Sequence, residues 1–324
     1  NYKVFKPFSK NPIKTLYHLF KDICDYKKES VKSRLFDNFR NDYLEMSDYF
    51  EKKDNPIFPQ AAAYIVGSDQ VWNPFLTGGV DRIYLLDEIK DTKKISYAAS
   101  SGNLKYIDNK KDEFFSKYNN FDRVSVREEK LKKYLEKNSE KKVDVVVDPT
   151  LLMSKEMWRN FAGAERIEKE KYIFVYSVNN SNELFVNFVN KFAKEKNLKI
   201  IYFDKRDIMN KFKVRKKSYY ETGPKEFVNL LYYSEYVITT SFHGTALSCV
   251  LNKKFYVVLS TFPDRLDTIL ETLDLKSRVV NDMKDYDKIL ADKIDWEKSN
   301  KLLEKARNKS LKWLFDSIEC DKNE

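Results

Sequence analysis

The chain has 324 residues, of which 42% are hydrophobic and 34% charged; this composition excludes a disordered protein, and the length suggests two globular domains. The net charge of +10 favours anionic partners such as phosphorylated small molecules, but the sequence contains no nucleic-acid-binding motif. The three cysteines lie far apart, and no apolar run approaches the roughly 20 residues of a membrane span. We therefore expect a cytoplasmic protein that needs no metal, no cofactor and no nucleic acid.

Residues 1–55 are polar and mostly helical in their pattern. From residue 61 onwards, short apolar runs alternate with amphipathic helical stretches, for example at 129–137. The runs are typical of buried parallel strands and lie at 63–66, 94–98, 123–126 and 143–147. This alternation predicts a doubly wound α/β domain.

A second series of the same kind follows a charged stretch at 165–171. It predicts strands at 172–178, 198–203, 236–240 and 255–259, helices at 182–196, 225–233 and 245–251, and a closing helix at 304–318. The expected fold is therefore α/β with two Rossmann-like domains, an N-terminal one over 1–165 and a C-terminal one over 166–324.

Polar residues stand where several predicted strands end, and ligands of open parallel sheets bind outside those ends. In chain order these residues include Ser68, Asp69, Gln70, Ser100, Ser101, Arg127, Asn179, Ser241 and His243. A serine, aspartate or asparagine at such a place can instead simply cap the next helix. Because arginine and histidine are not capping residues, the set as a whole indicates a ligand site.

The segment Ser241-Phe242-His243-Gly244-Thr245 joins an apolar strand to a helix of small residues. The free N–H groups and the positive dipole end at a helix start can bind a phosphate, and a glycine lets the backbone approach an anion. His243 is one of two histidines in the chain. The alternative is a histidine that only hydrogen-bonds a neighbouring loop.

Three further residues have both a functional and a structural interpretation. Arg127 can hold a carboxylate or phosphate in bidentate fashion, or it can pair with Glu128 or Glu129. Asp69 can act as a base or bind sugar hydroxyls. Trp72 can stack on a sugar ring, or it can belong to the core.

Several motifs in order resemble the bacterial polysaccharide pyruvyl transferase family, from about residue 58 to 280. They are Tyr64-Ile65-Val66-Gly67-Ser68-Asp69-Gln70-Val71-Trp72-Asn73-Pro74, Ile95-Ser96-Tyr97-Ala98-Ala99-Ser100-Ser101-Gly102, Ser125-Val126-Arg127-Glu128, Val147-Asp148-Pro149-Thr150-Leu151-Leu152, Ser241-Phe242-His243-Gly244-Thr245 and Arg265-Leu266-Asp267-Thr268-Ile269-Leu270.

The resemblance implies a GT-B-like arrangement and transfer of a pyruvyl group from phosphoenolpyruvate to a sugar of a polysaccharide or lipid-linked oligosaccharide, with release of phosphate. It implies that Arg127 and His243 bind or activate the donor, and we expect Asp69 to complete the catalytic set by taking the proton from the acceptor hydroxyl. We expect the C-terminal domain to bind the donor through Ser241, Gly244, Thr245 and Asn179, and the N-terminal domain to bind the acceptor. The expected acceptor residues are Ser68, Gln70, Trp72, Ser100 and Ser101.

Two alternatives remain open at this point: a GT-B glycosyltransferase that uses a nucleotide sugar, and a non-catalytic, degenerate relative. The chain departs from the family's pattern because it begins at what looks like the end of the second strand, so a first βα unit is expected to be missing. The basic segment 205–217, which also carries apolar residues, suggests peripheral contact with the anionic inner face of a membrane.

Overall fold

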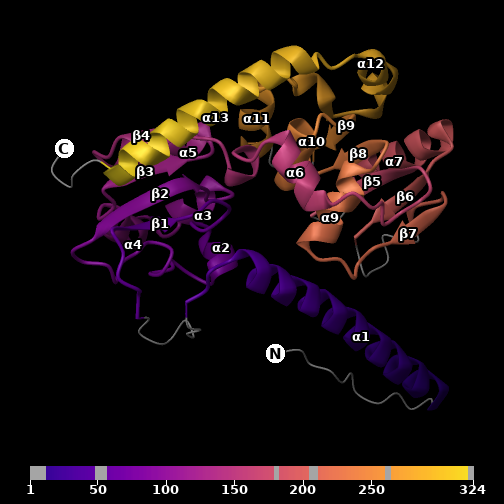
Figure 1. The fold of residues 1–324 in the computed structure, drawn as a ribbon, viewed down its shortest axis with the longest axis horizontal. Coiled ribbons are helices and arrows are strands. Elements are labelled where there is room, and N and C mark those ends of the chain that lie inside the picture. Colours follow the sequence, from indigo (N-terminus) through magenta and orange to yellow (C-terminus); the bar gives the residue numbers. More distant parts are fainter. Residues whose placement is uncertain (1–11, 48–56, 179–181, 204–210, 260–263, 320–324) are drawn as a thin grey trace. The chain divides into compact units, whose positions relative to one another are not determined.

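The computed structural model describes residues 12–47, 57–178, 182–203, 211–259 and 264–319, and it is a mixed α/β structure with parallel sheets (Figure 1). The chain divides into two compact units made of interleaved segments. The first unit comprises Asn1–Pro56, Arg159–Val175 and Val189–Tyr236, and the second Ile57–Trp158, Tyr176–Phe188 and Val237–Glu324. A single division of the chain after residue 165, as expected from the sequence, stays a prediction.

The second unit contains a four-stranded parallel sheet in the order β1-β2-β3-β4. Its strands are β1 (Ala63–Val66), β2 (Lys93–Ala99), β3 (Arg123–Val126) and β4 (Val143–Val145), as the apolar runs predict. Every residue of β2 is buried, which explains why that run shows no polar alternation. The connecting helices are α2 (Pro74–Thr77), α3 (Leu104–Asp108), α4 (Lys111–Tyr118) and α5 (Glu129–Asn138), and a 3-10 turn, η1 (Pro149–Leu151), follows β4.

The same unit contains β8 (Tyr236–Thr239), β9 (Phe255–Val258) and β10 (Val279–Val280), which pair in parallel with β9 in the middle. Between and after these strands lie α10 (Phe242–Val250), α11 (Asp264–Thr272), η2 (Lys276–Arg278), η3 (Met283–Asp285), α12 (Tyr286–Ala291) and α13 (Trp296–Glu319). Helix α10 begins three residues earlier than predicted, so His243 lies inside its first turn.

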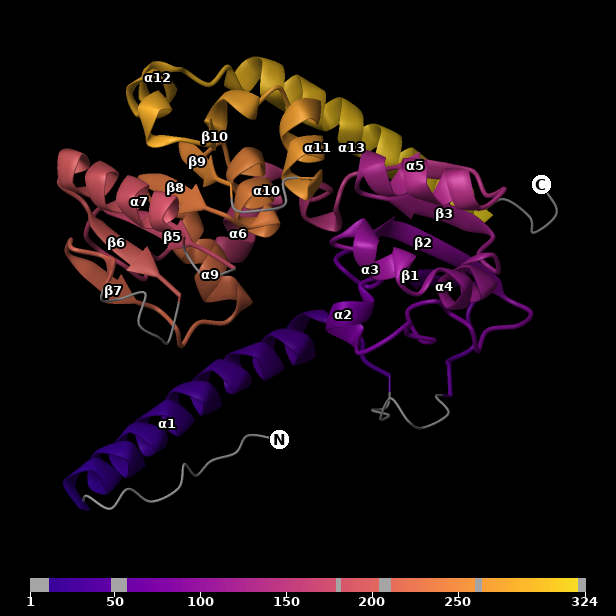
Figure 2. The same cartoon turned by 180° about the vertical axis from the view of Figure 1, so that it is seen from behind.

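The long closing helix α13 runs across β2 and β4 (Figures 1 and 2). Trp313 packs on Tyr97 and donates a hydrogen bond from Nε1 to Asp144 Oδ2 at 2.9 Å. Ser310 Oγ accepts a bond of 3.0 Å from the Val147 N–H, just past β4. The helix therefore caps one face of the sheet and also satisfies a backbone donor beyond the last strand.

The first unit contains the parallel strands β5 (Tyr172–Tyr176), β6 (Lys199–Tyr202) and β7 (Lys216–Ser218), with β6 in the middle. It also contains α1 (Pro12–Tyr43) and α9 (Pro224–Tyr232), while α6 (Lys155–Ala162) and α7 (Glu183–Lys196) run through its boundaries. Near α9, a Cβ at Gly223 would lie 2.8 Å from Leu35 Cβ, which shows how closely α1 approaches. Strand β7 was not predicted, because its three residues are polar and half exposed or exposed.

A buried carboxylate joins the strands of the first unit. Glu168 accepts bonds from Tyr219 Oη and Lys199 Nζ, both at 3.0 Å, and from Lys217 Nζ at 3.4 Å. Burial alone would raise the pKa of Glu168, but Lys199, the Glu170 N–H and Tyr219 together lower it to about 2. The charged form is therefore strongly favoured in the folded state.

We predict that Glu168→Gln lowers the free energy of unfolding at pH 7 by about 2–3 kcal/mol. The lowered pKa means that this stabilisation is complete above the ordinary pKa of 4.5 and is lost as the pH falls towards about 2. Urea unfolding of the wild type and Glu168→Gln at pH 7 and pH 3.5 measures this loss of unfolding free energy. The exposed Glu170→Gln is the matched control and should change little; equal losses in both variants at pH 7 would contradict the assignment.

Candidate active site

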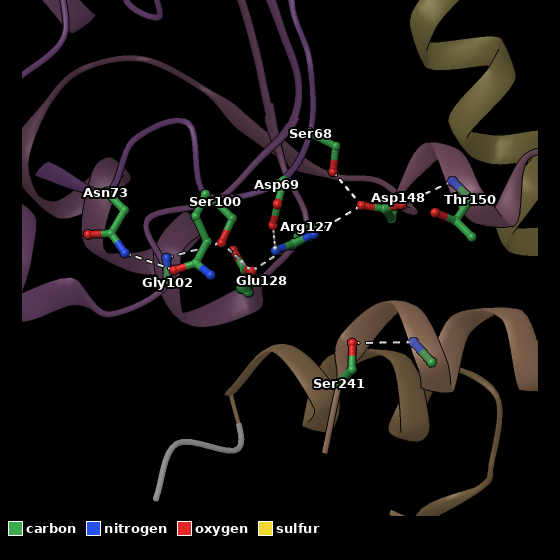
Figure 3. Close-up of polar contacts among 12 residues, drawn as sticks. Ser68, Asp69, Asn73, Ser100, Gly102, Arg127, Glu128, Asp148, Thr150 and Ser241 are labelled. Atoms are coloured by element: carbon green, nitrogen blue, oxygen red, sulfur yellow. Dashed lines mark hydrogen bonds and ion pairs between the residues drawn. The ribbon is translucent and has the colours of Figure 1, made fainter. Parts of the chain in front are cut away.

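The polar ends of the four strands β1 to β4 converge on one side chain, Arg127 (Figure 3). Its Nη2 lies 3.1 Å from Asp69 Oδ1, its Nε 3.0 Å from Glu128 Oε1, and its Nη1 3.0 Å from Asp148 Oδ2. The guanidinium carbon Cζ lies 4.4 Å from the ring centre of Phe242 in α10, over the ring. One cation thus contacts three carboxylates and one aromatic ring.

Two of the three carboxylates are buried and have further donors. Glu128 Oε1 also accepts a 2.7 Å bond from the hydroxyl of Ser100. Asp148 Oδ2 accepts a bond from the hydroxyl of Ser68, and its Oδ1 accepts one of 3.0 Å from the Thr150 N–H, so that Asp148 caps η1. Ser68 and Ser100 therefore hold the carboxylates in place.

The pKa values of these groups follow from burial and from the shared cation. Burial would lower the pKa of Arg127, but Glu128, Asp148 and Asp69 raise it above its usual value. Burial would raise the pKa of Asp148, but Arg127, Ser68 and His243 lower it. For Glu128 burial prevails over Arg127 and Ser100, so its pKa is raised.

Arg127 forms ion pairs with the carboxylates of Asp69, Glu128 and Asp148. Its side chain is 1% exposed, and Nε, Nη1 and Nη2 all donate to them. A donor phosphate that displaced Glu128 or Asp148 would leave a buried carboxylate without its partner, which is costly, whereas Asp69 on Nη2 is exposed. The structure shows an ion pair of Arg127 with Glu128, and the role of Arg127 in donor binding stays a prediction.

Asp69 differs from the other two carboxylates because its side chain is 59% exposed. Its backbone lies in the left-handed region with φ of +67°, and its carbonyl accepts a bond from the Ser100 N–H at 2.9 Å. These constraints point the carboxylate to solvent while Arg127 binds one of its oxygens. Asp69 is therefore the carboxylate of this cluster that can contact a substrate hydroxyl.

Among the other expected acceptor residues, Gln70 lies over Gly102. A Cβ at Gly102 would come 1.9 Å from Gln70 Oε1, and the φ of Gly102 is +70°, so this position requires glycine. Gln70 Oε1 also accepts a 2.8 Å bond from Asn73, which caps α2. Ser101 is buried.

Trp72 lies in the core. It is 3% exposed, donates a 3.1 Å hydrogen bond from Nε1 to the Tyr84 carbonyl, and packs edge-on against aromatic rings. Those rings belong to Phe114, Tyr118 and Phe121. The structure thus corrects the stacking interpretation of Trp72, because its side chain is buried among core aromatics.

At the start of α10, most of the motif residues build the helix itself. Ser241 is the N-cap and accepts a long 3.4 Å bond from the Gly244 N–H, and the Thr245 hydroxyl donates to the Ser241 carbonyl at 2.9 Å. A Cβ at Gly244 would lie 2.6 Å from Thr239 Oγ1, so the glycine permits close packing of α10 on β8. His243 is half-buried, and its charge lowers the pKa of the nearby Asp148. Asn179 lies outside the described residues.

Next to Arg127 lies a cavity of about 170 Å³. Arg127 and Asp148 contribute its polar wall, and side chains of α10, α11 and α13 complete it. The remaining lining includes Val146, Leu151, Phe242, Thr268, Ile269, Thr272 and Lys309. Its size suits a small anion rather than a whole sugar nucleotide.

Three site residues were missed as candidates: Glu128, Asp148 and Arg265. The first two follow strands within quoted motifs, so their positions alone could have identified them. Arg265 lies in the first turn of α11, and the charges of Arg127, Glu128 and Asp69 act on it.

Within the described ranges, no group of three His, Cys, Asp or Glu side chains could hold a metal ion, and no described helix has the length and hydropathy to cross a membrane.

The parallel sheets and the polar cluster at their carboxyl edge define a mixed α/β protein of the GT-B kind. One solved structure with this fold, assigned as a UDP-N-acetylglucosamine 2-epimerase from Listeria monocytogenes, has a TM-score of 0.51 at 11% identity and covers 92% of this chain and 81% of its own. A second, UDP-GlcNAc 2-epimerase from Neisseria meningitidis bound to UDP-GlcNAc, has a TM-score of 0.48 at 12% identity, with coverage of 97% and 84%.

Residues 4–261 match the family described as polysaccharide pyruvyl transferase, and the chain belongs to that family. This confirms the resemblance inferred from the motifs. The sequence has no match among curated proteins.

The Arg127 cluster generates a stability prediction. Arg127→Gln should lower the free energy of unfolding by about 3–5 kcal/mol, because it leaves buried carboxylates without their counterion. Arg123→Gln is the matched control: it removes the same charge from the opposite end of β3 and should cost little. Urea unfolding of both variants measures the difference, and a loss below about 1 kcal/mol for Arg127→Gln would refute the proposed importance of the cluster.

Proposed function

We propose that this protein transfers a pyruvyl group from phosphoenolpyruvate to two hydroxyls of a sugar in a polysaccharide or lipid-linked oligosaccharide, forming a ketal. Family membership supports pyruvyl transfer to a polysaccharide. The observation that carries the proposal for this chain is the placement of an exposed carboxylate, Asp69, and a half-buried histidine, His243, around one Arg127 cluster.

The reaction needs one proton on the methylene carbon of phosphoenolpyruvate, which gives a methyl group and an oxocarbenium-like centre. The two acceptor hydroxyls add to that carbon as the C–O bond to phosphate breaks. Of the two hydroxyl protons released, one replaces the proton consumed and one leaves with phosphate. We assign His243 to proton transfer at the donor and Asp69 to the acceptor hydroxyl.

Arg127, Glu128 and Asp148 have a positioning role in this proposal. Arg127 Nη2 lies 3.1 Å from Asp69 Oδ1 and thereby orients this carboxylate as a base. Ser68 and Ser100 act one step further away, through Asp148 and Glu128. Ser241, Gly244 and Thr245 set the start of α10, and so the position of His243.

The expected membrane contact has weaker support. Residues 205–210 of the basic segment lie outside the described residues, and Phe212 is buried. Arg215 pairs with Glu170 at 3.3 Å and Lys217 with Glu168 at 3.4 Å. Among the described residues of this segment, then, part of the basic charge forms ion pairs within the first unit instead of facing a membrane surface.

Phosphate release from phosphoenolpyruvate, measured over a panel of oligosaccharide glycosides, tests the donor class. Release of nucleotide from UDP-sugars without phosphate release would contradict the proposal and favour a glycosyltransferase. Turnover of neither donor would also contradict it and would favour a non-catalytic relative.

His243→Ala should lower the rate of phosphate release by roughly two decades or more while leaving the melting temperature nearly unchanged. The physical reason is that the imidazole is the proton-transfer group and Ser241, not His243, caps α10. His18→Ala, at the other histidine of the chain, is the control. A His243→Ala variant with near wild-type turnover would remove the histidine from the mechanism.

A further inference from the structure

Strand β2 contains an irregularity just before it reaches the candidate site. Its pairing with β3 advances by three residues along β2, from Ser96 to Ala99, but by only two along β3. The two residues between them, Tyr97 and Ala98, therefore stand opposite one residue of β3, Ser125. Such an extra residue is a β-bulge; bulges are uncommon in parallel pairs and are over-represented next to active sites, where they redirect side chains.

The bulge changes which side of the sheet the residues of β2 meet. In a regular strand Tyr97 and Ala99 would share one face, and Ala98 would lie on the other. In the structure Ala98 instead packs in one core cluster with Tyr97 and with Trp313 of α13, whereas Ala99 packs in a different core cluster. The side chains from Ala99 onwards are therefore reversed relative to a regular strand.

The bulged conformation is unfavourable by itself. Ala98 has a φ of +50°, in the left-handed region that residues other than glycine rarely adopt. Ala98 is also completely buried, and a buried N–H that the bulge removes from the regular ladder needs another acceptor. A strained backbone of this kind persists only where the surrounding structure holds it in place.

Ser125 on the neighbouring strand supplies the missing contacts. Its Oγ accepts a hydrogen bond of 3.2 Å from the Ala98 N–H and donates one of 2.9 Å to the Ser96 carbonyl. In return, Ser96 Oγ donates to the Ser125 carbonyl at 3.1 Å. Both serines are completely buried. Three hydrogen bonds that involve the two hydroxyls thus hold the bulge against β3.

The backbone that leaves the bulge contacts the Arg127 cluster directly. The Ser100 N–H donates to the Asp69 carbonyl at 2.9 Å, and the Ala99 carbonyl accepts a bond of 3.3 Å from the Arg127 N–H. The Ser100 hydroxyl donates to Glu128 Oε1 at 2.7 Å (Figure 3). If β2 moved by one residue relative to β3, it would present a different residue at each of these contacts.

We propose that Ser125 is a positioning residue: it holds the β2 bulge and thereby sets the orientation of Asp69 towards the acceptor hydroxyl. The proposal rests on the proposed function for the role of Asp69 as a base. Ser125 is completely buried and acts only through the backbone of β2. A displacement of about 1 Å at a reacting group can lower turnover roughly 100-fold, so a small relaxation of the bulge has a large effect on the rate.

Phosphate release from phosphoenolpyruvate with a glycoside acceptor, compared with melting temperature, tests this role. Ser125→Ala removes the hydroxyl and should lower kcat about tenfold or more, with little change in KM for phosphoenolpyruvate. Ser125→Thr keeps the hydroxyl but adds a buried methyl group, so it should lower the melting temperature and retain most of the turnover.

Ser317→Ala is the matched control, because it removes an equally buried hydroxyl that donates to the Trp313 carbonyl within α13. Its kcat should equal that of the wild type. If Ser125 is merely structural, turnover will instead follow melting temperature across all variants. That result, or wild-type kcat in Ser125→Ala, would overturn the proposal.

Hydrogen exchange of backbone amides, followed by NMR, tests the bulge without any turnover. Ser125→Ala should speed exchange at Ser100, whose N–H binds Asp69, about tenfold or more. The Val146 N–H, which donates to the Val126 carbonyl on the other side of β3, should exchange as in the wild type. Equal acceleration at both amides, or none, contradicts the proposal. If the wild type releases no phosphate, the proposed function fails, and this measurement still decides whether Ser125 holds the bulge.

If Ser125→Ala does not fold, Ser96→Ala takes its place, because it removes only one of the three hydrogen bonds at the bulge. It should lower kcat by a smaller factor and speed exchange at Ser100. Wild-type values of both quantities in Ser96→Ala would overturn the proposal.

Discussion

The buried guanidinium of Arg127 is the interaction on which the candidate site depends. It contacts Asp69 after β1 and Asp148 after β4, and through Glu128 it reaches Ser100 after β2. Burying an ion pair is favourable only when every charge finds a partner, so each of these side chains constrains the others. The result is a rigid polar edge at the carboxyl ends of the four strands.

This rigidity has a chemical consequence. A carboxylate that is both exposed and paired with a buried cation keeps its orientation, which suits a base acting on a sugar hydroxyl. Asp69 meets both conditions, whereas Asp148 and Glu128 are covered. The same arrangement occupies Nε, Nη1 and Nη2 of Arg127 with the carboxylates of the cluster.

Helix α10 shows how packing and site geometry are coupled. Gly244 allows the helix to lie against Thr239 of β8, and the Ser241 cap defines where the first turn starts. Both features set the position of Phe242 on Arg127 and of His243 next to it. A motif that suggests a phosphate-binding turn thus also acts as the support for two side chains of the site.

The sequence by itself determined the α/β class, the parallel strands and the family, because buried runs and ordered motifs are local in the chain. It also indicated that the ends of the strands carry the site. It did not determine which of those residues face a ligand. Trp72 lies in the core, and Arg127 forms ion pairs with three carboxylates. Only the tertiary structure decided this, because two of the three partners of Arg127 lie 58 residues before it and 21 after it.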